Sequence, residues 1–388
     1  MIGGEICSLL GSSAVAATLP TLIAQWHLSS AQAGWLSGAY FIGYALSVPF
    51  LVSLTDRIDS RVVFALGCVA GAAAAFGFAS FARDLWSGLA FWALAGVSTA
   101  AVYMPGLRVI IDRVAPSIRL RAVPYYTASF GIGISLSFLV AGLCAQAHGW
   151  GAAFDAGGCG CLAASACVAL ATASRLGAVP PARGSGSFDW RAVLANRRAL
   201  RYIVAYGGHA WELFALRAWL VAFLLFAWNR GAGGDPGHAL TYWSAAIALI
   251  GVPSSIAGAE CALRVGRPQL ILSVAVASVG IALLTAWFGS HAFLAGAIAL
   301  LFYSVAVLAD SGALTAGVVD AAAPGKQGST LALHSLVGFA GGALGPIVVG
   351  VVLSWGGGVE SALGWGLAFA VMAAGSALAA LALAGAGR

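Results

Sequence analysis

The sequence predicts an all-α polytopic membrane protein with twelve transmembrane helices in two pseudo-symmetric halves of six. Three observations predict this fold class: the composition, the number of long apolar runs, and an internal repeat. Of the 388 residues, 61% are hydrophobic and only 8% are charged, whereas in a soluble domain about a quarter are charged. Such a composition cannot cover a water-facing surface, so we expect most of the chain to lie in a lipid bilayer.

Apolar runs long enough to cross the bilayer set the number of helices. A hydrocarbon core of about 30 Å needs about 20 apolar residues in a helix. Twelve such runs are bounded by charges, Pro/Gly clusters or polar turns, at residues 5–25, 33–54, 62–82, 86–109, 124–146, 151–173, 202–228, 241–263, 268–289, 292–317, 329–354 and 362–385. The longest polar interruption predicts a cytoplasmic linker, 175–201, between an N-terminal half (1–174) and a C-terminal half (202–388).

The positions of the basic residues predict the orientation of the chain. Cytoplasmic loops of membrane proteins carry an excess of Lys and Arg. With both termini in the cytoplasm, sixteen of the nineteen basic residues fall on the cytoplasmic side, Arg83 and Arg230 fall outside, and Arg217 lies within a span. We therefore expect an integral protein of a bacterial inner (plasma) membrane. The cations are spread over several loops without interleaved aromatic residues, which argues against a nucleic-acid partner.

The first apolar run is not predicted to be a cleaved signal peptide, because no basic segment precedes it and its small-residue stretch lies inside the run. Met1 lies nearly at the predicted membrane edge. This leaves two expectations, a very short cytoplasmic tail or a start of translation upstream of Met1. Glu5, close to the start of the run, is expected at the membrane interface, with a role in the central cavity as the alternative.

An internal repeat relates the two halves. A shift of 208 residues superposes identical residues in and around the second, fourth and fifth spans of each half: Trp35 on Trp243, Gly43 on Gly251, Asp112 on Asp320, Pro116 on Pro324 and Gly142 on Gly350. Six helices repeated in parallel orientation and joined by a linker are an architecture of secondary transporters, whose halves rock about a central site. The repeat argues for the fold more strongly than for a function.

The loop between the second and third spans resembles a family signature. Its sequence LVSLTDRIDSRVVFALG is similar to the loop motif of the major facilitator superfamily, close to G-x-L-x-D-R-x-G-R-R. The matching positions are Leu54, Asp56, Arg57 and Arg61, and the departing positions are Val52, Asp59 and Ser60. The segment GAECALRVGR is a weaker match in the second half. The resemblance covers essentially the whole chain and implies a secondary transporter that works by alternating access.

The resemblance also implies a gating role for charged residues of these two loops. In the superfamily the first loop is implicated in holding the outward-facing state. The residues that carry this implication here are Asp56, Arg57 and Arg61, with Glu260 and Arg267 in the second half. A partly buried carboxylate that faces a helix N-terminus and pairs with arginine stabilises one conformation by about 1–2 kcal/mol. The alternative is that these charges only set the topology in a solvated loop.

The seventh span carries three ionisable residues within its apolar run: His209, Glu212 and Arg217. Such residues are costly in hydrocarbon and usually face a cavity. At 100° per residue, Glu212 lies about 60° to one side of His209 and Arg217 about 80° to the other, so we expect one broad polar face. Counted from Tyr202 at 1.5 Å per residue, Glu212 lies about 15 Å deep and Arg217 about 22 Å. These depths bracket the midplane, where such transporters bind substrates.

Two later spans add polar residues at membrane depth. Asp310 and Ser311 lie in the tenth span, and His334 lies in the eleventh. In the superfamily, spans one, four, seven and ten line the cavity, with two, five, eight and eleven beside them, so the resemblance implies that these residues converge. Their equivalents 208 positions earlier are apolar or neutral: Val102, Tyr103 and Tyr126. The sequence therefore predicts that the ionisable chemistry is concentrated in the second half.

These residues indicate proton-coupled transport of a small organic anion. Carboxylates beside His or Arg in a low-dielectric interior can exchange protons near neutral pH. Arg217 offers a permanent forked cation for a carboxylate or phosphate. One alternative is an exporter of hydrophobic cations, which would meet Glu212 and Asp310 and stack on Trp211 and Trp219. A second is a polar cluster that only fixes helix packing, and a third is a non-transporting receptor, against which the lack of a soluble sensory segment argues.

No sequence motif indicates enzymatic or cofactor chemistry. The chain lacks a nucleotide-binding glycine loop, a GxSxG elbow and an HExxH helix. Its seven cysteines fall in apolar spans, where they behave as small apolar residues, and three methionines are too few for a copper path. We therefore expect no enzyme activity, no cofactor and no metal site, and we expect the protein to act as a monomer.

Overall fold

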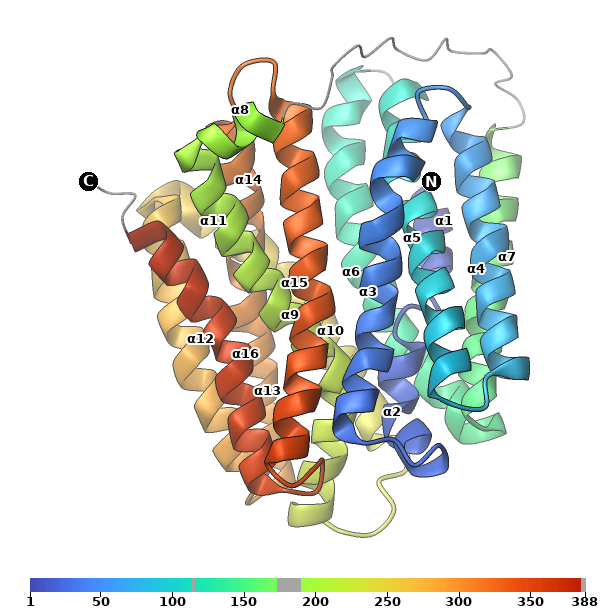
Figure 1. Cartoon of the computed structure of the whole chain (residues 1–388), viewed down its shortest axis with the longest axis vertical. Coiled ribbons are helices and arrows are strands. Elements are labelled where there is room, and N and C mark those ends of the chain that lie inside the picture. Colours follow the sequence, from blue (N-terminus) through green and yellow to red (C-terminus); the bar gives the residue numbers. More distant parts are fainter. Residues whose placement is uncertain (114–115, 173–189, 385–388) are drawn as a thin grey trace. The chain divides into compact units, whose positions relative to one another are not determined.

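The computed structural model describes residues 1–113, 116–172 and 190–384, and this part of the chain is helical, without a β-strand (Figure 1). The helices, in chain order, are α1 (Ile2–Ser8), α2 (Ala14–Gln25), α3 (Ser30–Leu54), α4 (Ser60–Phe81), α5 (Leu85–Arg113), α6 (Pro116–His148), α7 (Trp150–Thr172), α8 (Trp190–Ala195), α9 (Arg197–Gly231), α10 (Ala239–Leu249), α11 (Gly251–Val265), α12 (Arg267–Gly289), α13 (Phe293–Ala309), α14 (Ser311–Ala321), α15 (Gln327–Trp355) and α16 (Ala362–Ala384).

The chain divides into two compact units. Unit 1 comprises Met1–Trp26 and Ala39–Ser185, and unit 2 comprises His27–Gly38 and Gly186–Arg388. The boundary after residue 185 falls inside the predicted linker, of which 175–189 lie outside the described residues. The rest of that linker is helical, because α8 and the first residues of α9 occupy it. The Asn196 side chain caps α9 by accepting a hydrogen bond from the Ala199 N–H at 3.1 Å.

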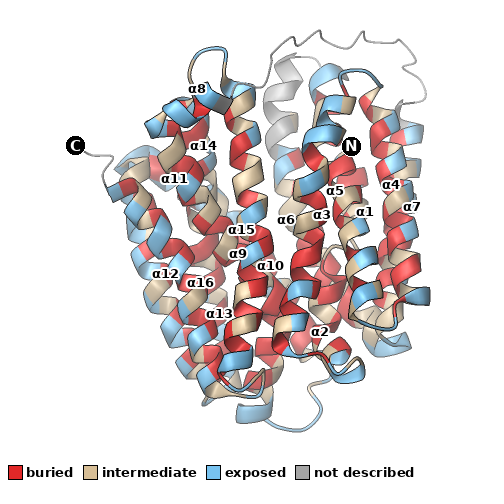
Figure 2. Cartoon of the chain, in the orientation of Figure 1, coloured by how far each residue is buried: buried red, intermediate tan, exposed pale blue. Residues whose placement is uncertain are grey.

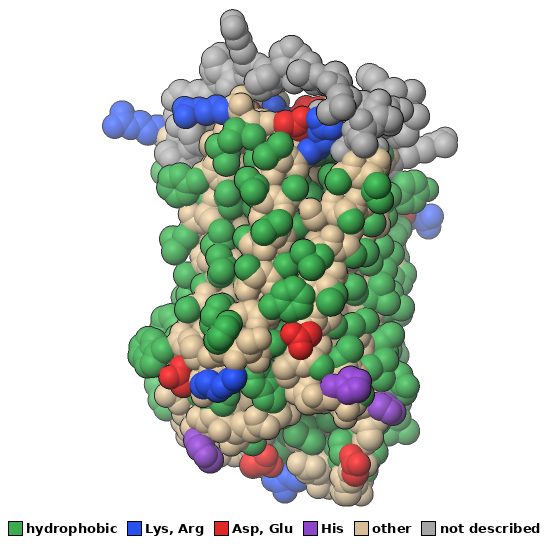
Figure 3. Space-filling view, turned by 90° about the vertical axis from the view of Figure 1, so that its right-hand side faces the viewer, with side chains coloured by type: hydrophobic (Ala, Val, Ile, Leu, Met, Phe, Trp, Pro, Cys, Tyr) green, Lys and Arg blue, Asp and Glu red, His purple; other side chains and the backbone are tan. Residues whose placement is uncertain are grey.

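Eleven of the described segments are long and apolar enough to cross a membrane. They correspond to eleven of the twelve predicted spans. The exception is the span predicted at 5–25, which the structure divides into two short helices, α1 and α2. On the face shown in Figure 3, apolar side chains cover the middle of the surface and most charged side chains lie toward its two ends. This distribution fits a hydrocarbon layer around the helices.

Three predicted spans are interrupted. Residues 9–13 form a turn between α1 and α2, Ile250 alone separates α10 from α11, and Asp310 alone separates α13 from α14. At the first interruption, the Ser137 hydroxyl of α6 accepts from the Ser13 N–H and donates to the Leu10 carbonyl, each at 2.8 Å. Backbone groups freed from a helix at membrane depth must find such partners. In transporters, interrupted helices accompany binding sites.

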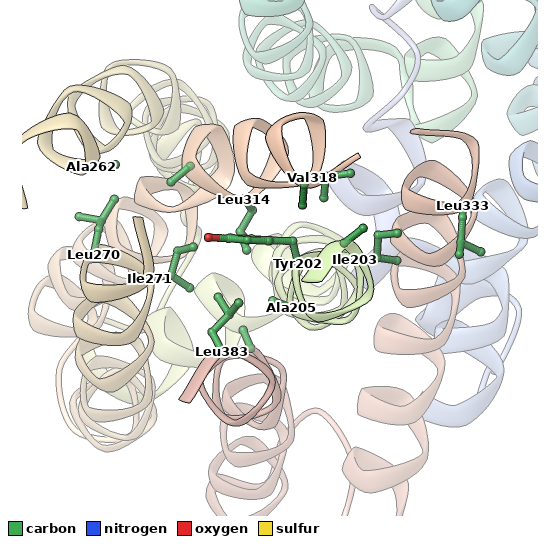
Figure 4. Close-up of a cluster of buried hydrophobic side chains, with 14 of the residues drawn as sticks. Tyr202, Ile203, Ala205, Ala262, Leu270, Ile271, Leu314, Val318, Leu333 and Leu383 are labelled. Atoms are coloured by element: carbon green, nitrogen blue, oxygen red, sulfur yellow. The ribbon is translucent and has the colours of Figure 1, made fainter. Parts of the chain in front are cut away.

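Helix α9 runs through the interior of unit 2, where it packs against α15, α16, α13 and α14. Residues around most of the circumference of α9 are buried (Figure 2), as expected for a helix enclosed by other helices. Figure 4 shows one end of this core, where Tyr202 and Ile203 of α9 lie among side chains of the surrounding helices, including Leu270, Leu314 and Leu383. The polar residues of α9 are therefore held on a rigid, well-packed element.

The close approach of α11 to α13 depends on Gly258, because a Cβ there would overlap the carbonyl oxygen of Ala309. We expect Gly258→Ala to push apart the helices next to Asp310 and to lower the free energy of unfolding by about 1–3 kcal/mol. Gly280→Ala on α12 is the matched control, since no atom lies within 4 Å of its added Cβ. Thermal unfolding in detergent should show a lower midpoint for the first variant only. Equal midpoints would contradict the close approach.

Candidate functional site

Glu212 is enclosed within unit 2 by three hydroxyl groups from three other helices. Ser278 of α12 and Tyr303 of α13 donate to its Oε1, at 2.8 and 2.6 Å. Ser376 of α16 donates to Oε2. With 1% of the residue exposed and both oxygens bonded, the carboxyl is fitted to its surroundings rather than open to a ligand. Its contacts favour a role in holding these helices together.

His209 and Asp310 are in buried contact at the junction of α13 and α14, a contact that is an ion pair when His209 is protonated. Nδ1 of His209 lies 2.8 Å from Oδ1 of Asp310, and both residues are 4% exposed. The two atoms are within ion-pair distance but are not aligned as a hydrogen bond, so Oδ1 has no hydrogen-bond partner among the described residues. Ser311, the next residue, is half-buried, and its hydroxyl has no such partner in the described part of the chain either. The junction thus leaves hydrogen-bonding capacity unused.

A stack of aromatic rings connects this pair to α15. The Tyr206 ring lies 3.8 Å from the His334 ring and 5.7 Å from the His209 ring, measured between centroids. His334 is 6% exposed, and within the described residues its Nδ1 has no hydrogen-bond partner. Tyr206, His209, Asp310 and His334 therefore form one contiguous group. Sequence reasoning missed Tyr206, although its position three residues before His209 places it on the same side of the helix.

Arg217 forms no hydrogen bond or ion pair with this group. Its guanidinium carbon lies 5.9 Å from the centroid of the Phe214 ring, and it makes no ion pair or hydrogen bond with any described residue. The side chain is half-buried, and it lies three residues beyond the middle of the 35-residue helix α9. Because Tyr206 precedes Arg217 by eleven residues, the two share one face of the helix, about 20° apart.

The structure does not gather the three charged groups of α9 at one place. Glu212 points about 140° away from Arg217 around the helix and bonds to α12, α13 and α16. His209, between them, contacts Asp310. The broad polar face expected from the sequence is therefore divided into a closed side, which carries Glu212, and a less buried side with Tyr206, Phe214 and Arg217. The spacing of residues along a helix predicts the direction in which each side chain points. It does not show which side of the helix is packed against another helix.

The predicted gating residues take part in short-range ion pairs on the side expected to be cytoplasmic. In unit 1, Arg108 of α5 bonds Asp56 at 3.3 Å and Asp112 at 3.1 Å. In unit 2, Arg267 bonds Asp320 at the end of α14 at 2.5 Å. The Arg108–Asp56 pair joins α5 to the loop after α3, and the Arg267–Asp320 pair joins the first residue of α12 to the end of α14. Partly exposed pairs of this kind contribute about 0–1 kcal/mol each.

The remaining gating candidates differ in their surroundings. Arg61 bonds Asp59, the N-cap of its own helix α4, at 2.7 Å. Arg57 and Glu260 are exposed and form no ion pair with the residues that the structure describes. Arg61 is thus paired within its own loop. Arg57 and Glu260 are free of ion pairs with the described residues and accessible to other groups. A gating role for any of these residues stays a prediction.

Glu5, expected at the membrane interface, is fully buried within the protein. Its exposure is 0%, and the Tyr126 hydroxyl of α6 donates to its Oε2 at 2.6 Å. The same hydroxyl lies 2.9 Å from the Tyr103 carbonyl oxygen. An ionisable group is therefore buried in the first half as well as in the second. The internal repeat indicates this buried acid, because Glu5 precedes Glu212 by 207 residues, one residue short of the repeat offset.

No group of three or more metal-ligating side chains is found among the described residues. The acids and histidines of the site occur as the pair His209 and Asp310, with His334 held by Tyr206 instead. Among the described residues, the site thus contains the contacting pair His209 and Asp310 and, separately from it, the guanidinium of Arg217.

Comparisons with known proteins agree with this architecture. Residues 1–346 match the family model described as the Major Facilitator Superfamily. A bacterial homologue of the human lysosomal transporter Spinster has a similar crystal structure, with a TM-score of 0.77 over 98% of this chain and 93% of that one, at 16% identity. The nucleoside transporter NupG gives a TM-score of 0.71 over 98% of this chain and 97% of that one, also at 16% identity. At these identities the likeness concerns the fold alone.

Two characterised proteins are similar in sequence over part of the chain. The niacin transporter NiaP of Acinetobacter baylyi is 28% identical over 155 residues, which is 40% of this chain and 35% of NiaP. The galacturonate transporter of Dickeya chrysanthemi is 29% identical over 152 residues, which is 39% of this chain and 44% of that protein. The matched segments thus span less than half the length of either relative.

Proposed function

The chain belongs to the major facilitator superfamily, and from this premise we propose that it moves a small organic anion across a bacterial inner membrane by alternating access, coupled to protons. As a member of that superfamily the chain is a membrane transporter. The substrate class, the coupling ion and the cytoplasmic position of both termini are parts of the proposal. Arg217 is the proposed anion-binding residue, and the pair His209 and Asp310 is the proposed coupling site.

The observation that carries the proposal is the unpaired guanidinium of Arg217. A permanently charged side chain near the middle of a membrane helix is costly unless a counter-charge is near. No described residue supplies that charge, and Phe214 offers only the face of its ring. A carboxylate on the substrate would supply it, since the guanidinium fork fits a carboxylate with two parallel hydrogen bonds.

The names of the two sequence relatives support the same substrate class. Niacin and galacturonate are both small carboxylic acids, although one has an aromatic ring and the other is a sugar acid. What they share is the group that Arg217 would bind. The rings of Tyr206 and Phe214, on the same side of α9, are suited to contact the rest of a small flat or ring-shaped substrate.

The surroundings of Glu212 argue against the competing proposal of an exporter of hydrophobic cations. That alternative places Glu212 and Asp310 against the substrate, but the two oxygens of Glu212 already accept hydrogen bonds from three hydroxyl groups. A cation that displaced them would leave three buried hydroxyls to be satisfied elsewhere.

Transport by the purified protein in liposomes tests the proposal. Radiolabelled nicotinate and galacturonate would be offered with and without an imposed pH gradient, and a panel of other small carboxylates would follow. We expect at least one carboxylate to accumulate against its gradient when the outside is acidic, and a protonophore to abolish the accumulation. Empty liposomes are the control. Transport restricted to a lipophilic cation, with every carboxylate inert, would overturn the proposal.

A further inference from the structure

We infer that the carboxyl group of Glu5 is a second proton-binding site, which lies in unit 1 and is separate from the pair of His209 and Asp310 in unit 2. The proton adds to the carboxylate oxygen Oε1 and leaves from the same atom to water. This inference extends the proposed proton coupling and rests on it for its role in transport, but the binding of the proton itself is testable without any substrate.

The first argument is the incomplete bonding of the Glu5 carboxyl. Oε2 accepts from the Tyr126 hydroxyl, whereas Oε1 is buried without a hydrogen-bond partner among the described residues. A buried carboxylate with a bare oxygen is far costlier than the neutral acid, so the environment favours uptake of a proton. Glu212 in unit 2 has a saturated carboxyl, and the two acids therefore differ in bonding although they stand at nearly equivalent positions of the repeat.

Second, no cation of the described residues compensates the charge of a Glu5 carboxylate. Neither the amino terminus nor any Arg, Lys or His of the described residues forms an ion pair with it. Helices α5, α6 and α7 pack against α1, and Phe64 of α4 lies beside Gly4. The titratable groups around Glu5 on α3 to α7 are phenols and thiols, which are neutral near pH 7: Tyr40, Tyr44, Cys68, Tyr103, Tyr126 and Cys161.

The third argument is the placement of Glu5 beside an interrupted helix. It lies on α1, one turn before the break at 9–13, and α6 supplies both the hydroxyl of Tyr126 to its carboxyl and the hydroxyl of Ser137 to the broken backbone. A change in the charge of Glu5 would therefore act on the contact between α1 and α6, where the backbone is least constrained by its own helix. Interrupted helices are where transporter folds commonly bind coupling ions.

Infrared spectroscopy of the purified protein in detergent, recorded over a pH series without substrate, tests the inference. We expect the protonated-carboxyl absorption that grows on acidification to contain a component that is missing in Glu5→Gln, which resembles the protonated acid in shape, while the contributions of the other carboxyl groups remain. Glu212→Gln is the matched control and should keep that signal. Identical spectra for the unmodified protein and Glu5→Gln would overturn the inference.

A second variant keeps the test valid if Glu5→Gln does not fold. Tyr126→Phe leaves Glu5 in place and removes only the hydroxyl that bonds to Oε2. The carboxyl signal should change frequency in this variant, and an unchanged signal would overturn the assignment to Glu5. If the signal belongs to Glu5 but no pH gradient drives transport by the unmodified protein, the proton-binding site stands and the proposed coupling fails.

Discussion

Replacing Arg217 by Ala is expected to reduce uptake of the anionic substrate at least thirtyfold at low substrate concentration. Removing one partner of a buried charge pair costs about 2–5 kcal/mol, and about 2 kcal/mol corresponds to roughly a thirtyfold loss of affinity. The uptake rate of Arg217→Lys should lie between those of the unmodified protein and Arg217→Ala, because lysine keeps the charge but lacks the planar fork that holds a carboxylate at two points. Initial rates of nicotinate and galacturonate uptake into liposomes would measure both changes.

Arg230→Ala is the matched control for this prediction. Arg230 lies on the same helix, and its guanidinium carbon is 5.6 Å from the Phe226 ring, an arrangement like that of Arg217 over Phe214. Arg230 is exposed near the end of α9, so we expect normal uptake after its removal. Two results together would defeat the anion proposal: intact anion uptake by Arg217→Ala, and loss of cation efflux by Glu212→Gln.

Most of the fold is predictable from the sequence, because a long apolar run must be covered by lipid or protein whatever its partners are. This holds for eleven of the predicted spans, which correspond to described helices. The exception, at 5–25, has the required composition but not a continuous helix. At the break at 9–13, the Ser137 hydroxyl, more than 120 residues away in the chain, accepts from the Ser13 N–H and donates to the Leu10 carbonyl. A hydropathy pattern contains no information about such a partner.

The site is predictable in its residue types but not in its contacts. An acid, a base or a histidine inside an apolar run stands out in the sequence, which is why His209, Glu212, Arg217, Asp310 and His334 can be selected. Which of them is closed off depends on hydroxyl groups of distant helices. The serines and the tyrosine that bond to Glu212 are ordinary residues of their own spans, at least 66 positions away. The burial of Glu5 is not predictable for a related reason, since it depends on the helices that pack over α1.

Asp310→Asn is expected to abolish substrate accumulation driven by a pH gradient. The exchange of labelled for unlabelled substrate across the membrane should remain intact. Asparagine keeps the shape of the side chain but cannot carry a negative charge, so the ion pair with His209, at 2.8 Å in the structure, cannot form. A carrier whose coupling group no longer titrates can still bind substrate and reorient, but the pH gradient no longer biases the direction of transport. Arg217, which makes no contact with Asp310, should keep its affinity for the anion.

Two further variants separate coupling from folding in this experiment. His209→Gln removes the other member of the pair. It should give the same loss of accumulation with retained exchange, because the pair needs both residues. Asp155→Asn, at an exposed acid of α7, should accumulate substrate normally and controls for the loss of a carboxylate as such. Because Asp310 is buried at a helix junction, the melting temperature of each variant must be measured alongside. Normal gradient-driven accumulation by a folded Asp310→Asn protein would exclude Asp310 as the coupling group.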